Sequence, residues 1–162
     1  MIRVLFVVCC GFLLCGCGNA SGQTQREAKK TADALTGDAK GSAAANPVCK
    51  LFTVADMGKY IAAPVTAGRN ATGSCQWPLK ADENKGWVMV SIVPDSYAPF
   101  VPREAKQLPD VGIQGYVFKD VYSWVAGAIR GDESITVAMN GPSANENAAV
   151  DLLKETLKRY KK

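Results

Sequence analysis

The chain has 162 residues, of which 48% are hydrophobic and 21% are charged, and its formal net charge is +4. This length suits one domain, and the mild charge excess does not resemble the dense basic stripe of a nucleic-acid-binding protein. Histidine is absent, which removes the commonest metal ligand and the commonest general base near neutral pH.

The first residues have the pattern of a bacterial export signal. A single cation, Arg3, precedes an apolar run from Val4 to Leu14. That run is too short to span a bilayer, which takes about 20 apolar residues, but it suits the core of a signal peptide.

The run ends in Leu14-Cys15-Gly16-Cys17, which resembles the lipobox of bacterial lipoproteins. The resemblance implies a signal peptide over residues 1–16, cleavage before Cys17, and lipid on its sulfur and its new amine, palmitate included. Several acyl chains hold a protein firmly at a membrane. We expect a lipid anchor in the cell membrane or, as Gly18 favours, the outer membrane, with the domain facing the periplasm or the extracellular side. The alternative is an ordinary secretory leader cut near Asn19-Ala20.

Residues 17–46 are predicted to be the lipidated cysteine and a flexible tether. The segment is rich in small and polar residues, and Leu35 is its only large apolar residue. Such a composition cannot bury enough surface to offset the entropy lost on ordering. A flexible chain of this length has a root-mean-square span of about 30 Å. A frayed helix from Arg26 to Leu35 is the alternative.

Residues 47–162 are predicted to form a single domain that begins with a helix. Thr53 can cap this helix, and Asp56 follows three residues later, near its positive end. Phe52 and Met57 are spaced for a hydrophobic staple across the cap. Val54, Met57 and Ile61 would share one face, and Pro64 would stop the element.

The middle of the domain is predicted to be strands. Gly86 to Val93 is apolar on both faces, as in a strand inside a sheet. In the last strand, Ile135, Val137 and Met139 alternate with smaller or polar residues, which predicts a half-buried strand. Further strands are expected over residues 74–79 and 116–129, with a hairpin turn at Gly131-Asp132.

A second helix is predicted at the end of the chain, where Ser143 and Glu146 have the spacing of a capping box. Apolar residues then recur at helical spacing, and cations gather at the negative end of the helix. We therefore expect an α+β fold in which an antiparallel sheet packs against an N-terminal and a C-terminal helix. The residues on the packing face are Ala149, Leu152, Leu153, Thr156 and Tyr160.

Cys49 and Cys75 are the two cysteines left once the leader is removed and Cys17 carries lipid. An even pair in an exported protein predicts a disulfide, although two buried thiols are an alternative. The pair does not form a CxxC motif, so we do not expect redox catalysis from it.

Several short motifs together resemble one known family. These are a cysteine just before a helix, then Gly73–Trp77, Val88–Ile92 and Val111–Tyr116, followed by a strand and a terminal helix. The family comprises small extracytoplasmic bacterial lipoproteins of unknown function. It is similar to the sensor ectodomains of some bacterial serine/threonine kinases and loosely to the repeats of β-lactamase inhibitory proteins. The resemblance covers residues 48–162, implies a Cys49–Cys75 bridge and transfers no catalytic residue.

Two features are candidates for a binding site. Asp95 to Gln114 is a long connection that contains three prolines, and long ordered loops often carry function. We favour a plain crossover with a short helix near Arg103 to Gln107 over a mobile flap. Large aromatic residues could line a binding face, but we favour a place in the core for them. They are Trp77, Trp87, Trp124, Tyr116, Phe118 and Tyr122.

The expected function is a non-enzymatic binding or accessory module with an unknown small ligand or envelope protein as partner. The alternative is a protein–protein interaction module or an enzyme inhibitor. We expect no catalytic residue, cofactor or metal, because the chain has no GxSxG, P-loop or metal-binding motif. The spacing of the candidate carboxylates along the sequence does not support a hydrolytic pair among them. These are Asp110, Asp120, Asp132 and Glu133.

Overall fold

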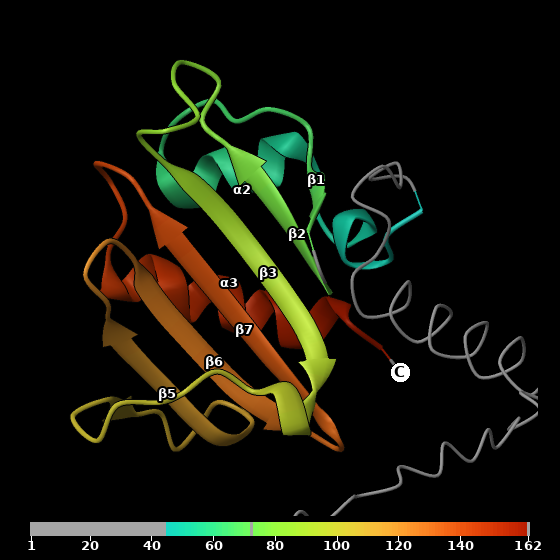
Figure 1. Ribbon diagram of the computed structural model, residues 1–162, viewed down its shortest axis with the longest axis vertical. Helices are drawn as coiled ribbons and strands as arrows, with labels where there is room; N and C mark the ends of the chain where they lie inside the picture. Colours follow the sequence, from blue (N-terminus) through green and yellow to red (C-terminus); the bar gives the residue numbers. More distant parts are fainter. Residues whose placement is uncertain (1–44, 72, 162) are drawn as a thin grey trace, which may run out of the picture.

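The computed structural model describes residues 45–71 and 73–161, which form one antiparallel sheet with two α-helices behind it (Figure 1). The predicted signal peptide, Cys17 and the tether as far as residue 44 lie outside the described residues. The helical elements are η1 (Val48–Lys50), α2 (Val54–Ile61), η2 (Asp95–Tyr97) and α3 (Glu146–Arg159). The strands are β1 (Arg69–Ala71), β2 (Ser74–Pro78), β3 (Trp87–Pro94), β4 (Lys106–Gln107), β5 (Ile113–Lys119), β6 (Trp124–Arg130) and β7 (Glu133–Asn140).

The sheet has seven strands in the order β1-β2-β3-β7-β6-β5-β4, and all neighbouring strands are antiparallel. Strand β7 enters between β3 and β6, so residues far apart in the sequence become neighbours at the centre. The predicted antiparallel sheet, C-terminal helix and disulfide are confirmed, and a short helix, α2, precedes the sheet.

The strands largely follow the predicted ranges. Strand β3 lies inside the sheet, as its two apolar faces predict, and the range 116–129 contains parts of β5 and β6. Gly131 turns the β6–β7 hairpin with a φ of 64°, a left-handed conformation that glycine adopts without a steric cost. The short edge strands β1 and β4 have no counterpart among the predicted elements.

Helix α2 begins with a full capping box. The Thr53 hydroxyl accepts from the Asp56 N–H at 3.1 Å, and the Asp56 carboxylate accepts from the Thr53 N–H at 3.0 Å. Of the three residues predicted to share one face, Met57 and Ile61 are fully buried, whereas Val54 is 43% exposed. Val54 occupies the first helical position, which the sheet does not cover.

The predicted cap of the C-terminal helix is wrong. Asn145, not Ser143, caps α3, because its backbone is extended and its side-chain oxygen accepts from the Ala148 N–H at 3.0 Å. Glu146 is therefore the first helical residue and is too early to close a capping box. Its carboxylate instead pairs with Lys106 of β4.

The main core lies between the sheet and the helices. Ala149, Leu152, Leu153 and Thr156 of α3 are fully buried, as their helical spacing predicts. They pack against the central strands, while Phe52 meets Trp77 edge to face with ring centroids 6.4 Å apart.

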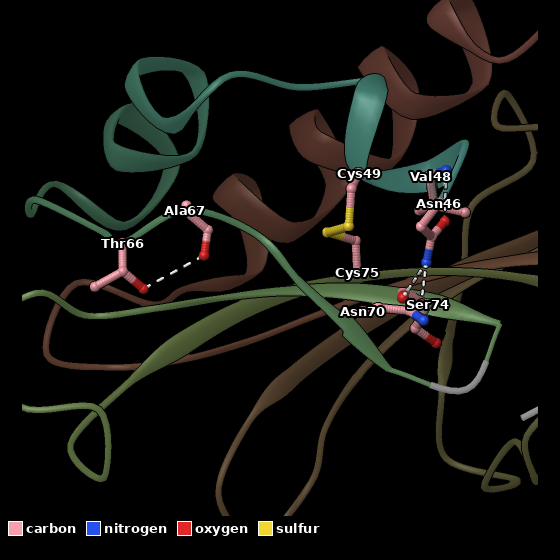
Figure 2. Close-up of a disulfide and its surroundings, with 8 residues drawn as sticks. All are labelled: Asn46, Val48, Cys49, Thr66, Ala67, Asn70, Ser74 and Cys75. Atoms are coloured by element: carbon pink, nitrogen blue, oxygen red, sulfur yellow. Dashed lines mark hydrogen bonds between the residues drawn. A yellow bond between two sulfur atoms is a disulfide. The ribbon is translucent and has the colours of Figure 1, made fainter. Parts of the chain in front are cut away.

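A disulfide between Cys49 and Cys75 joins η1 to β2, with 5.1 Å between the Cα atoms (Figure 2). Asn46 reinforces this join, because its amide donates to the Asn70 side chain at 2.6 Å and to the Ser74 carbonyl at 2.8 Å. The contacts of the described residues thus include Asn46, one residue before the predicted start of the domain. No helix in the described part of the chain is long and apolar enough to cross a membrane.

Candidate functional site

The sheet face opposite the helices is also covered. The sequence predicts that β7 is half-buried, but Ser134, Thr136 and Ala138 on this second face are 1%, 8% and 5% exposed. The prediction is wrong because the segment from η2 to β4 runs across this face (Figure 1). Ala105 and Val101 of that segment pack with side chains of β5, β6 and β7.

The segment contains no helix at residues 103–107. Lys106 and Gln107 instead pair with Val117 and Tyr116 as strand β4. The expected short helix is wrong because the edge of β5 offers unpaired backbone groups, and pairing with them satisfies more polar groups than one isolated helical turn. The segment is therefore fastened to the sheet at both of its ends.

Register brings Tyr116, Gly127 and Thr136, from three neighbouring strands, into one row on the second face. Tyr116 of β5 is opposite Gly127 of β6, and Gly127 is opposite Thr136 of β7. A Cβ atom at Gly127 would collide with the Tyr116 hydroxyl, so only glycine leaves room for the phenol there. The phenol thereby reaches across β6 toward Thr136.

Three hydroxyls on this face are buried without a hydrogen-bond partner among the described residues: Tyr116 Oη, Ser134 Oγ and Thr136 Oγ1. Tyr116 and Thr136 are close enough to interact electrostatically, but no hydrogen bond of ordinary geometry joins them. Burial raises the pKa of the Tyr116 phenol, and the Thr136 hydroxyl opposes this in part. The phenol is thus uncharged near neutral pH, and it can both donate and accept a hydrogen bond.

Tyr116 and Ser134 line a cavity of about 270 Å³ between the covering segment and the sheet. Asp95 lies at the start of the segment, where its N–H donates to the Asp132 carbonyl at 2.8 Å. Gln114 has a φ of 53°, an unfavourable conformation for a residue with a side chain, within the bulge of β5. Strained backbone of this kind is often found at functional sites. The full lining is Asp95, Ala98, Val101, Gln107, Gln114, Tyr116, Ile129 and Ser134.

A larger hollow of about 650 Å³ lies beside α2. Its lining, which includes Val54, Lys59 and Lys80, contains none of the three unpartnered hydroxyls. The cavity under the covering segment is therefore the stronger candidate site.

The six aromatic candidates do not form one binding face. Trp77 is buried in the helix-side core and Trp124 packs against it. Tyr116 belongs to the cluster on the second face, against which Trp87 and Phe118 pack. The Tyr116 ring stacks on Phe118 with 6.0 Å between the ring centroids. Tyr122 is 78% exposed in the β5–β6 turn, so the core prediction is wrong for this residue.

The four candidate carboxylates do not gather at one site, although Asp132 and Glu133 are neighbours in the chain. Asp120 and Asp132 lie in the turns at opposite ends of β6, and Asp110 precedes β5. Glu133 accepts a hydrogen bond from the Tyr160 hydroxyl at 3.0 Å. Among the described residues, no three His, Cys, Asp or Glu side chains cluster as metal ligands would.

Sequence reasoning missed Ser134 and Thr136 because it assigned their face to solvent. Three features of the sequence could together have indicated the covered face. They are the long connection from Asp95 to Gln114, a glycine within β6, and the small hydroxyl residues Ser134 and Thr136 on β7.

The described residues form an α+β fold with a small, partly polar cavity on the sheet face opposite its helices. Comparison with protein-family models, with curated proteins and with solved structures finds no match.

Proposed function

We propose that this protein is a non-enzymatic binding module of the bacterial cell envelope, held at a membrane by lipid on Cys17. The cavity under the covering segment is its ligand site. The observation that carries the proposal is the set of three unpartnered hydroxyls on Tyr116, Ser134 and Thr136.

Buried polar groups without partners are rare because each one costs roughly 1–3 kcal/mol. Three of them on one sheet face, two lining a cavity, are best explained by a ligand that supplies the missing partners. The contrast with Thr156 supports this interpretation, since its buried hydroxyl donates to the Leu152 carbonyl at 2.7 Å. Away from the cavity, the fold therefore provides a buried threonine hydroxyl with a hydrogen-bond partner.

The test compares two buried threonines. Thr136→Val should stabilise the unliganded protein by about 1 kcal/mol, because it replaces an unpartnered hydroxyl with a methyl group of similar shape. Thr156→Val should instead destabilise it by about 1 kcal/mol, since a made hydrogen bond is lost. Tyr116→Phe should behave like Thr136→Val. Urea unfolding measures all three free energies.

An equal loss of stability in Thr136→Val and Thr156→Val would contradict the proposal. It would mean that ordered water satisfies the hydroxyls and that the site is a structural feature of the sheet.

A second candidate function is protein interaction, including inhibition of an envelope enzyme. Tyr97 and Phe100 on the covering segment are 60% and 86% exposed, and exposed aromatic residues are common anchors at interfaces. Replacing both with serine should leave folding unchanged. If this variant loses an envelope crosslink that Tyr116→Phe retains, the interaction function is supported over small-ligand binding.

A further inference from the structure

We infer that the cavity accepts a small uncharged molecule rich in hydroxyl groups, of the size of one sugar ring. This inference rests on the proposed binding function and adds the chemical class of the ligand. Its basis is the polarity, the charge and the volume of the cavity.

The polar groups at the site match hydroxyls better than any other ligand group. The Tyr116 and Ser134 hydroxyls, which belong to residues that line the cavity, can each donate and accept, so each can pair with a ligand hydroxyl in either direction. At the exposed mouth, the Gln107 and Gln114 amides offer further donors and acceptors. A ligand that could only accept or only donate hydrogen bonds would use only the donors or only the acceptors of the lining.

The charge of the lining disfavours anions. Among the described residues, Asp95 is the only acidic residue in the lining, and no lysine or arginine lines the cavity. The Asp95 backbone is fixed by its bond to the Asp132 carbonyl and by the Ala98 N–H, which donates to the Asp95 carbonyl at 2.9 Å. A carboxylate or phosphate on the ligand would meet this acid without a compensating cation.

The apolar part of the lining fits the C–H faces of a sugar ring. Ala98, Val101 and Ile129 contribute aliphatic surface beside the Tyr116 ring. The volume of about 270 Å³ is below the roughly 300–1,000 Å³ of pockets for drug-sized ligands. A single ring therefore suits the cavity better than an oligosaccharide or a lipid.

The experiment varies the charge of a ligand while its shape stays nearly constant. The full-length chain, in a detergent without a sugar headgroup, is titrated calorimetrically with D-glucose and D-galactose, and then with the matching uronates and 2-amino sugars. At least one of the two neutral sugars should bind. The matching uronate should bind at least about tenfold more weakly than that sugar, and the matching amino sugar should bind at least as tightly as that sugar. Asp95→Asn should reduce the difference between sugar and uronate to less than about threefold.

Site variants locate the binding. Ser134→Ala and Tyr116→Phe should each weaken the affinity for the neutral sugar by about tenfold or more. Ser143→Ala should not change this affinity, because Ser143 does not line the cavity. Thermal unfolding with and without the sugar confirms that each variant is folded.

Several outcomes overturn the inference. They are no heat of binding with either neutral sugar, a uronate that binds as tightly as its sugar, or binding that Ser134→Ala leaves unchanged. If Thr136→Val nevertheless stabilises the unliganded chain while Thr156→Val does not, only the ligand class is wrong. If both valine variants lose stability equally, the binding function itself fails.

Discussion

Arg159 of α3 and Asp56 of α2 form an ion pair, with 3.0 Å between Arg159 Nη1 and Asp56 Oδ2. The same carboxylate oxygen accepts from the N–H and the hydroxyl of Thr53, so one group serves both the helix cap and the contact between helices. Arg159 also donates to the Leu51 carbonyl at 2.9 Å and lies over the Phe52 ring, 4.6 Å from its centroid. The two helices are thereby joined at one point.

Arg159→Gln should lower the free energy of unfolding by about 1 kcal/mol, allowing for solvent screening of a partly exposed pair. The matched control is Lys158→Gln, which removes the same charge from the same helix turn. Lys158 is 80% exposed and lies 3.7 Å from Glu155, so its loss should have little effect. Chemical denaturation of both variants measures the difference, and equal losses would show that only net charge matters.

The same pair predicts a contribution to acid sensitivity. The hydrogen bond from Arg159 is the largest cause that holds the Asp56 pKa well below its ordinary value of 3.8. A carboxyl whose pKa is depressed in the folded state contributes its full stabilisation above its unfolded pKa, and this contribution is lost progressively as the pH falls from that value through the lower folded pKa. Asp56→Asn should therefore destabilise the protein at about pH 6 and much less at about pH 2.

Urea unfolding of the wild-type and Asp56→Asn proteins at the two pH values tests this. Glu155 also has a lowered pKa, chiefly through Arg159, and is present in both proteins. An effect of Asp56→Asn that is independent of pH would indicate that the amide is a poor cap rather than that a charge is lost.

The disulfide closes a loop with a sequence separation of 26 residues. Removing it should cost about 2–5 kcal/mol, the usual range for a small exported domain. Cys49→Ala, Cys75→Ala and the double variant should lose similar amounts, because each breaks the same bond. Non-reducing peptide mapping should recover Cys49 joined to Cys75. Alkylation of both thiols without prior reduction would refute the bridge.

The observed helix cap distinguishes two neighbouring polar residues. Asn145→Ala should destabilise the protein by about 1 kcal/mol, because the Ala148 N–H loses its side-chain acceptor. Ser143→Ala is the control and should have little effect, since among the described contacts it is the Ser143 backbone carbonyl that accepts from Asn145. Thermal denaturation measures both. The reverse ranking would restore the capping box that the sequence predicts.

The lipid anchor remains a prediction from the sequence around Cys17. Cys17→Ser should abolish incorporation of labelled palmitate and leave uncleaved precursor or released protein. Cell fractionation and gel mobility measure these outcomes, and Cys15→Ser is the control that should still be labelled. A Cys17→Ser protein that incorporates label and remains with the membrane would refute the lipoprotein assignment.

Local chemistry in the sequence determined several parts of this fold. The Thr53 cap and the Gly131 turn depend on residues close together in the sequence, and the Cys49–Cys75 pair follows from an even number of cysteines. Helical spacing likewise identified the buried face of α3. These features can be predicted from sequence because a few neighbouring residues set the shape of a turn and the spacing at which side chains return to the same face of a helix or strand.

Tertiary structure alone decided where the candidate site lies. Tyr116 and Thr136 are brought together because β6 and β7 form a hairpin beside β5, with Gly127 between them. Ser134 is buried because a proline-rich segment pairs with the edge of β5 rather than forming its own helix. Strand pairing and long-range burial depend on which edges are free in the assembled sheet, and no short stretch of sequence carries that information.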